Sequence, residues 1–256
     1  MIYAWIGAVL IGLSLGLLGS GGSILTVPVL VYLAGVPGKV AIAESLAIVA
    51  VIALVGAVPY AWQRLVDVRS VLFFGLPGIV GTYGGAFLSQ FVSGGVQLVL
   101  FAGVMLVAAA LMFWSRERSE GEEAKGRHPA WQIALEGLGV GVLTGLVGVG
   151  GGFMIVPALV LLGGLPMRLA VGTSLVIIAL KSAAGFAKYL DVLGADGLSV
   201  DWKLIGVFAV IGVAGSMAGS RLGGYVPQAT LKKGFAVFLV VMGVFVLWRE
   251  LPGVLS

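Results

Sequence analysis

Two glycine-rich breaks inside apolar sequence carry the residues best suited to binding chemistry. The first is GSGGS, Gly19–Ser23, and the second is GVGGG, Gly148–Gly152. Free backbone N–H groups at such a break, next to a helix N-terminus with its partial positive charge, form a site for an anion. Ser20, Ser23 and Thr26 add hydroxyl groups to the first break. We therefore expect the two breaks to meet and to bind a small oxyanion.

Two ionisable residues lie inside apolar sequence. Lys181 is central in its predicted helix, where a charge costs about 2.5–3.5 kcal/mol on insertion scales. It is expected to attract the anion or to titrate as a coupling residue; a structural ion pair or a side chain that reaches the lipid surface are the alternatives. Glu44 is expected to carry a coupling proton, to pair with Lys181, or to be a solvated helix cap.

These residues belong to a unit that occurs twice. Leu17–Ser45 reads LLGSGGSILTVPVLVYLAGVPGKVAIAES, and Leu146–Ser174 reads LVGVGGGFMIVPALVLLGGLPMRLAVGTS. Pairing Gly21 with Gly150 also pairs Glu44 with Thr173. Further along, after a short insertion, Asp67 pairs with Asp201. We predict three parts: a first repeat over 1–114, a hydrophilic linker over 115–130 and a second repeat over 131–256. Paired, interrupted hydrophobic segments in two halves are typical of a transport site.

The composition places these repeats in a membrane. Of the 256 residues, 60% are hydrophobic and 10% are charged, against about 25% charged in soluble domains. The chain is therefore predicted to be an all-α, multi-pass membrane protein. The absence of cysteine excludes disulfides and thiol catalysis. A single histidine, His128 in the linker, argues against a buried metal site. The N-terminus is interpreted as a first helix and not a signal peptide.

The hydrophobic pattern predicts a broken hairpin and three membrane helices in each repeat. Pro28 and Pro157 either start the second arm of each hairpin or bend a helix that begins at Ile24 or Phe153. The predicted segments of the first repeat are Ile2–Leu18, Ile24–Ala34, Val40–Trp62, Val71–Phe91 and Val96–Trp114. Those of the second repeat are Trp131–Val147, Phe153–Gly163, Leu169–Tyr189, Leu204–Leu222 and Leu231–Trp248.

The second arm of each hairpin is too short to cross the bilayer, which favours inverted repeats. If each arm pair enters and leaves on one side, ten basic residues gather on one face and four on the other. A single crossing at each break gives nine against five. The positive-inside rule favours the first arrangement, with both termini outside and the linker in the cytoplasm. The face with ten carries Arg64, Arg69, Arg116, Arg118, Lys125, Arg127, Arg168, Arg221, Lys232 and Lys233.

Other polar and small residues are expected to have structural roles. Gly81–Gly85 and Gly215–Gly219 have the spacing of helix-packing faces. Tyr60 and Tyr189 are assigned to the aromatic belt at the membrane surface. Lys188 is assigned to a helix end as an interfacial anchor, and Gln97 is treated as an ordinary end residue.

The doubled motif resembles the TauE/SafE family of sulfite and organosulfonate exporters. It appears as GSGGSILTVP with VPGKVAIAESL and as GVGGGFMIVP with LPMRLAVGTSL, and LVDVRSV and LSVDWKLI precede the third helix of each repeat. The resemblance covers nearly the whole chain. It implies a plasma-membrane transporter that moves small sulfur-containing anions outward. Glu44 and Lys181 depart from the common pattern. The expected substrate-binding residues are Ser20, Gly21, Gly22, Ser23, Ser45, Gly150, Gly151, Gly152, Ser174 and Lys181.

Alternatives within transport are uptake of the same anions or movement of another small organic anion. A membrane scaffold without transport activity is a further alternative. A serine enzyme is disfavoured, because the second copy has Val149 and Gly152 in place of Ser20 and Ser23 and a serine nucleophile needs a nearby base. No Walker sequence is present, so ATP is not expected to drive transport directly. Protons are the expected coupling ion. No cofactor, metal or nucleic acid is expected, and small-residue helix faces allow a homodimer.

Overall fold

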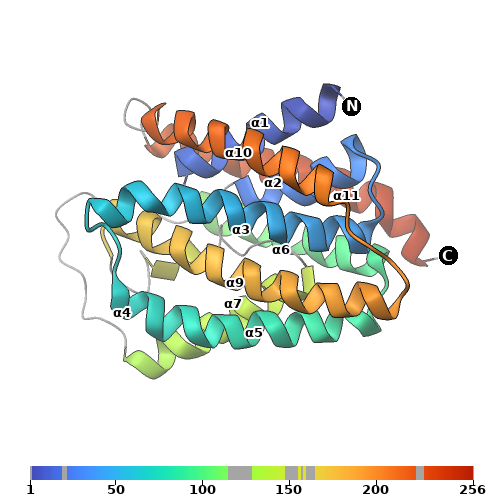
Figure 1. The fold of residues 1–256 in the computed structure, drawn as a ribbon, viewed down its shortest axis with the longest axis horizontal. Helices are drawn as coiled ribbons and strands as arrows, with labels where there is room; N and C mark the ends of the chain where they lie inside the picture. The colour runs from blue at the N-terminus through green and yellow to red at the C-terminus, as the bar shows by residue number, and fades with distance from the viewer. Residues whose placement is uncertain are drawn as a thin grey trace.

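The computed structural model describes residues 2–18, 22–114, 129–147, 155–156, 158–159, 165–222 and 228–255, and the regular structure in these residues is helical throughout. Long helices run side by side along the molecule (Figure 1). Both chain termini lie at one end of this bundle, called here the termini end. Within the described residues, five helices are long and apolar enough to cross a membrane: Gly38–Trp62, Val68–Phe91, Gly94–Leu111, Arg168–Ala195 and Trp202–Leu222.

The chain begins with an antiparallel hairpin. Helix α1 (Ile2–Leu18) is followed by α2 (Gly22–Pro28), which continues as the π-helical turn η1 (Val29–Leu33). Gly22 packs against Leu15, whereas Gly7 packs against Val29, so the second arm returns along the first. The predicted arms Ile2–Leu18 and Ile24–Ala34 are thus confirmed to within two residues.

Pro28 lies inside the second arm and does not start it. Of the two sequence-based alternatives, the early start is therefore correct for the first repeat, with the helix beginning at Gly22. A proline within a helix removes a backbone donor and crowds the preceding turn. The wider π-helical turn follows directly, and it ends with the backbone N–H of Ala34 donating to the carbonyl of Val29 at 3.0 Å. Pro157 lies outside the described residues.

Three long helical segments complete the first half. Helix α3 (Gly38–Trp62) leads to α4 (Val68–Ser70), whose N-terminus is capped by the Asp67 side chain. The chain then runs through η2 (Val71–Gly75), α5 (Leu76–Leu88) and η3 (Ser89–Phe91) into α6 (Gly94–Trp114). The helix predicted over Val71–Phe91 is therefore one apolar segment with a π-helical turn near its start.

The second half contains α7 (Ala130–Val147), α9 (Met167–Ala195), α10 (Trp202–Leu222) and α11 (Gln228–Leu255). Most of the predicted arm Phe153–Gly163 lies outside the described residues. Helix α9 was predicted to end at Tyr189, which is wrong: it continues to Ala195. It ends where Gly197 adopts a φ of 67°, and the Leu198 N–H donates to the Leu193 carbonyl at 2.8 Å. Glycine tolerates this left-handed conformation and therefore ends the helix. The polar residues after Tyr189 suggested an earlier end, but they do not stop a helix.

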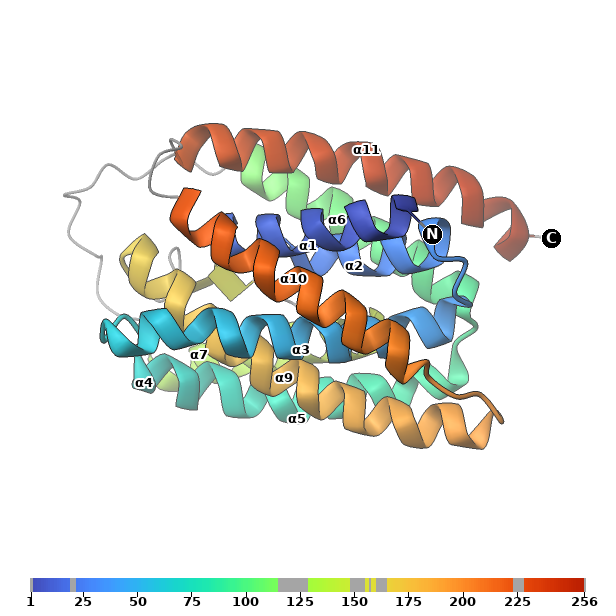
Figure 2. The same cartoon turned by 45° about the horizontal axis from the view of Figure 1, so that its top comes forward.

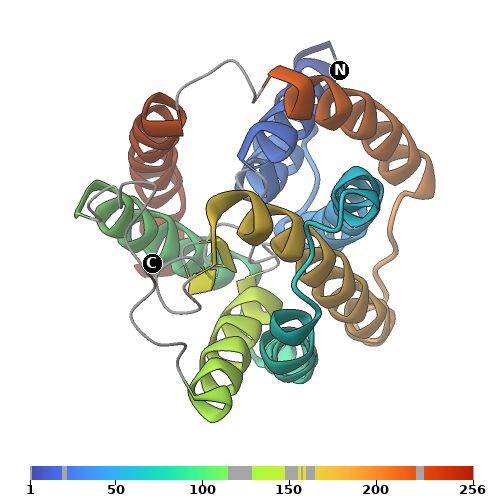
Figure 3. The same cartoon turned by 90° about the vertical axis from the view of Figure 1, so that its left-hand side faces the viewer.

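The two central helices are α3 and α9, which pack against each other. Viewed along the bundle, α1 with α10 lies on one side of them and α5 with α7 on the other (Figure 3). Helix α11 lies alongside α6, as the tilted view also shows (Figure 2). Buried residues make up 72% of the most apolar stretch of α3 and 67% of that of α9, against 39% for the other three candidate spans. Residues on α3 and α9 are therefore the best shielded from lipid.

The contacts of one half recur in the other. Helix α1 packs on α10 through Gly12 and Gly212, and α7 packs on α5 through Gly141 and Gly78. These are equivalent pairs in the alignment of the two repeats. Each helix pair approaches so closely that a Cβ on either Gly12 or Gly141 would collide with a backbone carbonyl oxygen.

The same correspondence holds further along these helices. A Cβ on Gly81 or Gly85 would collide with α7, and a Cβ on Gly219 would collide with α1. The predicted packing role of the Gly81–Gly85 and Gly215–Gly219 segments is thus confirmed.

Candidate functional site

Lys181 lies at the middle of α9 with its side chain completely buried. The stem packs on α5: Cδ lies 3.0 Å and Cε 3.1 Å from the place a Cβ on Gly78 would take. Nζ lies 5.6 Å from the centre of the Phe74 ring. Among the described residues, Nζ has no hydrogen-bond partner. The contact between α9 and α5 thus buries an amine. Among the described residues, this amine makes a cation–π contact with Phe74 but no hydrogen bond.

The other half has an apolar residue at the same place. The alignment that pairs Gly21 with Gly150 also pairs Ile52 with Lys181. Ile52 is fully buried, and its side chain packs on Gly212 as that of Lys181 packs on Gly78. The fold therefore accommodates an aliphatic side chain in this slot, which is the space beside the glycine of the neighbouring helix. Packing alone does not require a lysine there.

Ser182, the next residue, was not singled out from the sequence. It is fully buried, and its Oγ also has no hydrogen-bond partner among the described residues. The available signal was its direct succession to a lysine in an apolar helix. Lys181 brings an amine and Ser182 a hydroxyl into the protein interior, and neither group has a hydrogen-bond partner among the described residues.

Ser45 and Ser174 occupy equivalent places on the two central helices. Both are fully buried, and each donates back to its own helix: Ser45 Oγ to the carbonyl of Ile42 at 2.7 Å, and Ser174 Oγ to that of Val171 at 2.8 Å. Within the described part of the chain, no hydrogen bond joins Lys181 to either serine. The structure thus buries all three candidates but does not join either serine to Lys181 by a hydrogen bond.

Glu44 is buried and is not the solvated cap that was one interpretation of the sequence, because only 1% of its surface is exposed. It does not pair with Lys181 either, since Nζ has no bonding partner in the described residues. Instead, Glu44 Oε1 accepts a hydrogen bond of 2.7 Å from the backbone N–H of Asp201, which precedes α10. The carboxylate therefore connects α3 to the second half of the chain.

Thr173, the partner of Glu44 in the repeat, makes the corresponding connection. Its Oγ1 accepts a hydrogen bond of 2.8 Å from the backbone N–H of Asp67, which precedes α4. The hydroxyl also donates to the carbonyl of Leu169 at 2.6 Å. Asp67 and Asp201 are equivalent residues, so the two halves are joined reciprocally. The repeated Asp motif was visible in the sequence, but its cross-connection was not.

The first glycine break is described in part. Gly22 begins α2 and packs so closely on α1 that a Cβ there would collide with the carbonyl of Ile11. Ser23 and Thr26 are fully buried, and Thr26 Oγ1 donates to the carbonyl of Gly22 at 3.2 Å. The remaining break residues of the predicted site lie outside the described residues: Ser20, Gly21, Gly150, Gly151 and Gly152.

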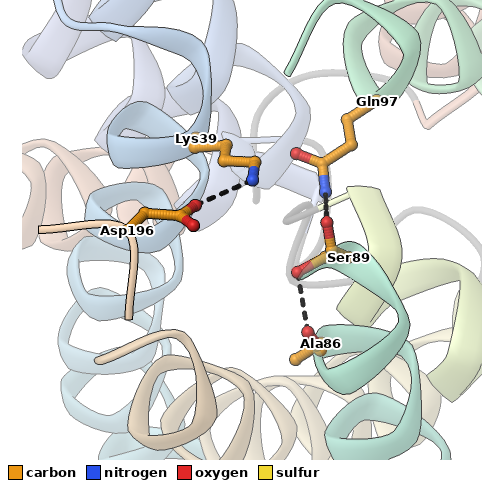
Figure 4. A network of polar contacts seen from close by, with 5 residues as sticks. All are labelled: Lys39, Ala86, Ser89, Gln97 and Asp196. Atoms are coloured by element: carbon orange, nitrogen blue, oxygen red, sulfur yellow. Dashed lines mark hydrogen bonds and ion pairs between the residues drawn. The ribbon is translucent and has the colours of Figure 1, made fainter. Parts of the chain in front are cut away.

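Two buried polar side chains, Tyr189 and Gln97, make hydrogen bonds near the end of α7 and the start of α6, and they are called the polar cluster. Tyr189 is fully buried, and its hydroxyl donates to the carbonyl of Leu146 at 3.2 Å. Its assignment to the aromatic belt is therefore wrong. Gln97 is also fully buried and donates through Nε2 to the carbonyl of Ser89 at 3.3 Å (Figure 4), so it is not an ordinary end residue. Polar side chains in the interior of an apolar helix bundle cannot be told from surface ones by composition.

Charged side chains lie near this cluster at the termini end. Lys39 Nζ pairs with Asp196 Oδ2 at 2.8 Å, which ties the start of α3 to the end of α9 (Figure 4). Lys188 was expected at a helix end, but α9 continues beyond it. Its Nζ bonds Asp191 at 3.3 Å and lies 5.5 Å from the centre of the Tyr83 ring. In the part of the chain that is described, no group of three His, Cys, Asp or Glu residues is arranged to hold a metal ion.

Comparison with known proteins agrees with the composition and fold. The family model described as Sulfite exporter TauE/SafE matches residues 4–246. A probable membrane transporter protein of Xylella fastidiosa is 32% identical, with 94% of this chain and 92% of the relative aligned. The probable membrane transporter protein YdhB of Bacillus subtilis is 26% identical, with 93% and 97% aligned. No solved structure matches the chain.

Proposed function

Because the chain belongs to the TauE/SafE sulfite exporter family, a family of multi-pass membrane transporters, we propose that it is a secondary transporter for small sulfur-containing anions. The substrate is sulfite or a small organosulfonate, and transport is outward across the plasma membrane. The family description and the transporter names of the relatives support this assignment.

The single observation that carries the proposal is the buried amine of Lys181, which has no hydrogen-bond partner among the described residues. Burying an ammonium group in apolar surroundings without a counter-ion is costly. An anion that reaches Nζ would supply the missing partner, and a hydrogen bond to a charged group contributes about 1.5–3 kcal/mol. Ser182 Oγ is a further donor on the same helix. Affinity of this size suits a protein that must release its cargo.

We assign the rest of the binding site to the two glycine breaks and the helices that follow them. The residues are those of the sequence analysis: Ser20, Gly21, Gly22, Ser23, Ser45, Gly150, Gly151, Gly152 and Ser174. Gly22 and Ser23 are in the first turn of α2, and a helix N-terminus carries a partial positive charge. This charge favours a bound oxyanion.

Transport is by alternating access of two inverted repeats, residues 1–114 and 131–256, joined by the linker 115–130. The reciprocal packing of α1 on α10 and of α7 on α5 supports this arrangement. The start of α3 pairs with the end of α9 through Lys39 and Asp196, so the central helices are antiparallel. A two-fold axis that exchanges two antiparallel membrane helices lies in the plane of the membrane, which is the symmetry of inverted repeats. The charge distribution supports an orientation with both termini outside and the linker in the cytoplasm.

The proposal is tested by anion flux into proteoliposomes. Sulfite, sulfoacetate, thiosulfate, sulfate and acetate are compared with and without a pH gradient. The variant Lys181→Ile gives this slot the residue of its counterpart Ile52, and Ile52→Leu serves as the matched control. We expect saturable flux of a sulfur anion that falls at least roughly tenfold in Lys181→Ile and persists in Ile52→Leu. Unchanged flux in Lys181→Ile, or flux of acetate alone, would contradict the proposal.

A further inference from the structure

Two hydrogen bonds between the halves are equivalent in position but not in chemistry. Glu44 Oε1 accepts from the Asp201 N–H at 2.7 Å, and Thr173 Oγ1 accepts from the Asp67 N–H at 2.8 Å. The first lies at the termini end, where α3 starts and the chain enters α10. The second lies at the opposite end, where α9 starts and the chain enters α4 (Figure 1). Each bond therefore joins one central helix to the segment that follows the other central helix.

The two aspartates are held alike by their side chains. Asp67 Oδ2 accepts from the backbone N–H of Ser70 at 3.0 Å and from its hydroxyl at 2.6 Å. Asp201 Oδ1 accepts from the backbone N–H groups of Lys203 at 2.8 Å and Leu204 at 3.1 Å. Both aspartates cap the helix that follows them. Their main-chain N–H groups, already fixed in direction, are the donors to the opposite half.

The acceptors differ in what remains free. Thr173 Oγ1 accepts one hydrogen bond and donates its single O–H in another. Glu44 Oε2 is buried and has no hydrogen-bond partner within the described residues. One oxygen of this carboxyl group thus holds the contact between the halves, while the other is available to bind a proton.

The charged surroundings of Glu44 come from few elements. Helices α1, α2 and α6, which pack on α3, contain no charged residue in their described parts. The charged groups of the termini end are on α3 itself, on α9 and its end, at the start of α10 and on α11: Lys39, Lys188, Asp191, Asp196, Asp201, Lys203, Arg249 and Glu250. Lys39 is paired with Asp196, and Lys188 with Asp191. Of all these residues, Asp201 is the one hydrogen-bonded to Glu44.

We propose that Glu44 is the proton-binding residue of a gate at the termini end and that the equivalent gate at Thr173 is insensitive to protons. A proton bound at Oε2 forms an O–H bond and removes the negative charge from the carboxyl group. Oε1 then accepts from Asp201 as a neutral group, and a neutral hydrogen bond is about half as strong as a charge-assisted one. The contact between the halves weakens, and this end opens.

This inference rests on the proposed alternating-access transport and identifies where its coupling ion acts. With the termini outside, protons from the outer side open the outer gate and are carried inward when it closes again. Anion release to the outside would then be coupled to proton entry. The opposite gate opens and closes with no titratable group in its hydrogen bond.

The native chain contains no cysteine, so single cysteines report each gate directly. Ser45→Cys and Ser174→Cys place a thiol one residue beyond Glu44 and Thr173, at two equivalent and fully buried positions. Each protein is reconstituted in nanodiscs, labelled with N-ethylmaleimide from mildly alkaline to mildly acidic pH, and followed by intact mass. The measured quantity is the ratio of the two labelling rates, because every thiol reacts faster as the pH rises. The same ratio in a Glu44→Gln background corrects for any difference between the two thiols themselves.

We expect the ratio of Ser45→Cys to Ser174→Cys labelling to rise roughly tenfold on acidification. In a Glu44→Gln background the ratio should already be high and should not respond to pH. Glu44→Thr recreates the hydroxyl that this fold uses at Thr173 and should also abolish the response. A ratio independent of pH in the native background would overturn the proposal, and so would a response that survives in Glu44→Gln or Glu44→Thr. No substrate is used, so this outcome is independent of the flux test at Lys181.

Discussion

Lys181 packs on Gly78 as Ile52 packs on Gly212 in the other half of the molecule. The lysine stem follows the path of an aliphatic side chain, and Nζ extends beyond it to lie 5.6 Å from the centre of the Phe74 ring. An internal repeat thus supplies its own reference: Ile52 shows what the slot holds when only packing is needed. Because Ile52 already satisfies the packing, the amine of Lys181 is the part of the side chain that packing does not explain.

The close helix contacts predict a sharp difference between neighbouring glycines on α7. A Cβ on Gly141 would collide with the carbonyl of Gly78, whereas Gly139 has nothing within 4 Å of such a Cβ. Gly141→Ala should therefore lower the free energy of unfolding by about 1–3 kcal/mol through forced separation of α5 and α7. Gly139→Ala should be neutral or stabilising by up to about 1 kcal/mol, because alanine favours helix.

Thermal unfolding followed by circular dichroism in one detergent measures both variants. The repeat provides an independent control, since Gly12→Ala on α1 should behave as Gly141→Ala does and Gly206→Ala on α10 as Gly139→Ala does. Equal unfolding temperatures for Gly141→Ala and Gly139→Ala would contradict the prediction, because they would mean that α5 and α7 can move apart without loss of stability.

The hydrogen bond from Tyr189 to the Leu146 carbonyl predicts an effect of removing one oxygen atom. Tyr189→Phe leaves the ring in place but leaves the carbonyl near the end of α7 without this donor. The expected loss of stability is about 1 kcal/mol. Tyr60→Phe, at the equivalent position on α3 but partly exposed, should cost less. Chemical unfolding in mixed micelles compares the two, and a larger loss at Tyr60 would reverse the assigned roles.

Much of this arrangement could be predicted from the sequence because the signals were local or repeated. Hydrophobic stretches gave α1, α3, α6 and α10 to within two residues, and the doubled motif identified equivalent positions. The burial of Tyr189 and Gln97 could not be predicted, since polar residues near helix ends are common both at membrane surfaces and inside polar clusters. The partner of Glu44 is a main-chain N–H, and a backbone donor leaves no trace in residue type.

The ion pair at the termini end should matter little for stability. The side chains of Lys39 and Asp196 are 20% and 42% exposed, and exposed pairs typically contribute less than about 1 kcal/mol. Lys39→Met should lower the unfolding midpoint by a few degrees at most, and added salt should reduce the difference further. A large loss that high salt does not diminish would indicate that the pair acts as a buried one.

The slot around Lys181 predicts that the protein becomes more stable when its proposed binding residue is removed. Lys181→Ile deletes a buried amine that has no hydrogen-bond partner among the described residues and substitutes the side chain found at Ile52. Relief of that desolvation should raise the free energy of unfolding by about 1–3 kcal/mol. The reciprocal variant Ile52→Lys should lower it by at least as much, because it buries an amine beside Gly212. Both are measured by thermal unfolding in the absence of anions.

Adding a transported anion should then stabilise the native protein and leave Lys181→Ile unchanged, because only the native slot offers the anion a cation. A Lys181→Ile protein less stable than the native one would mean that the lysine already has a stabilising partner, and an anion would gain nothing by replacing it.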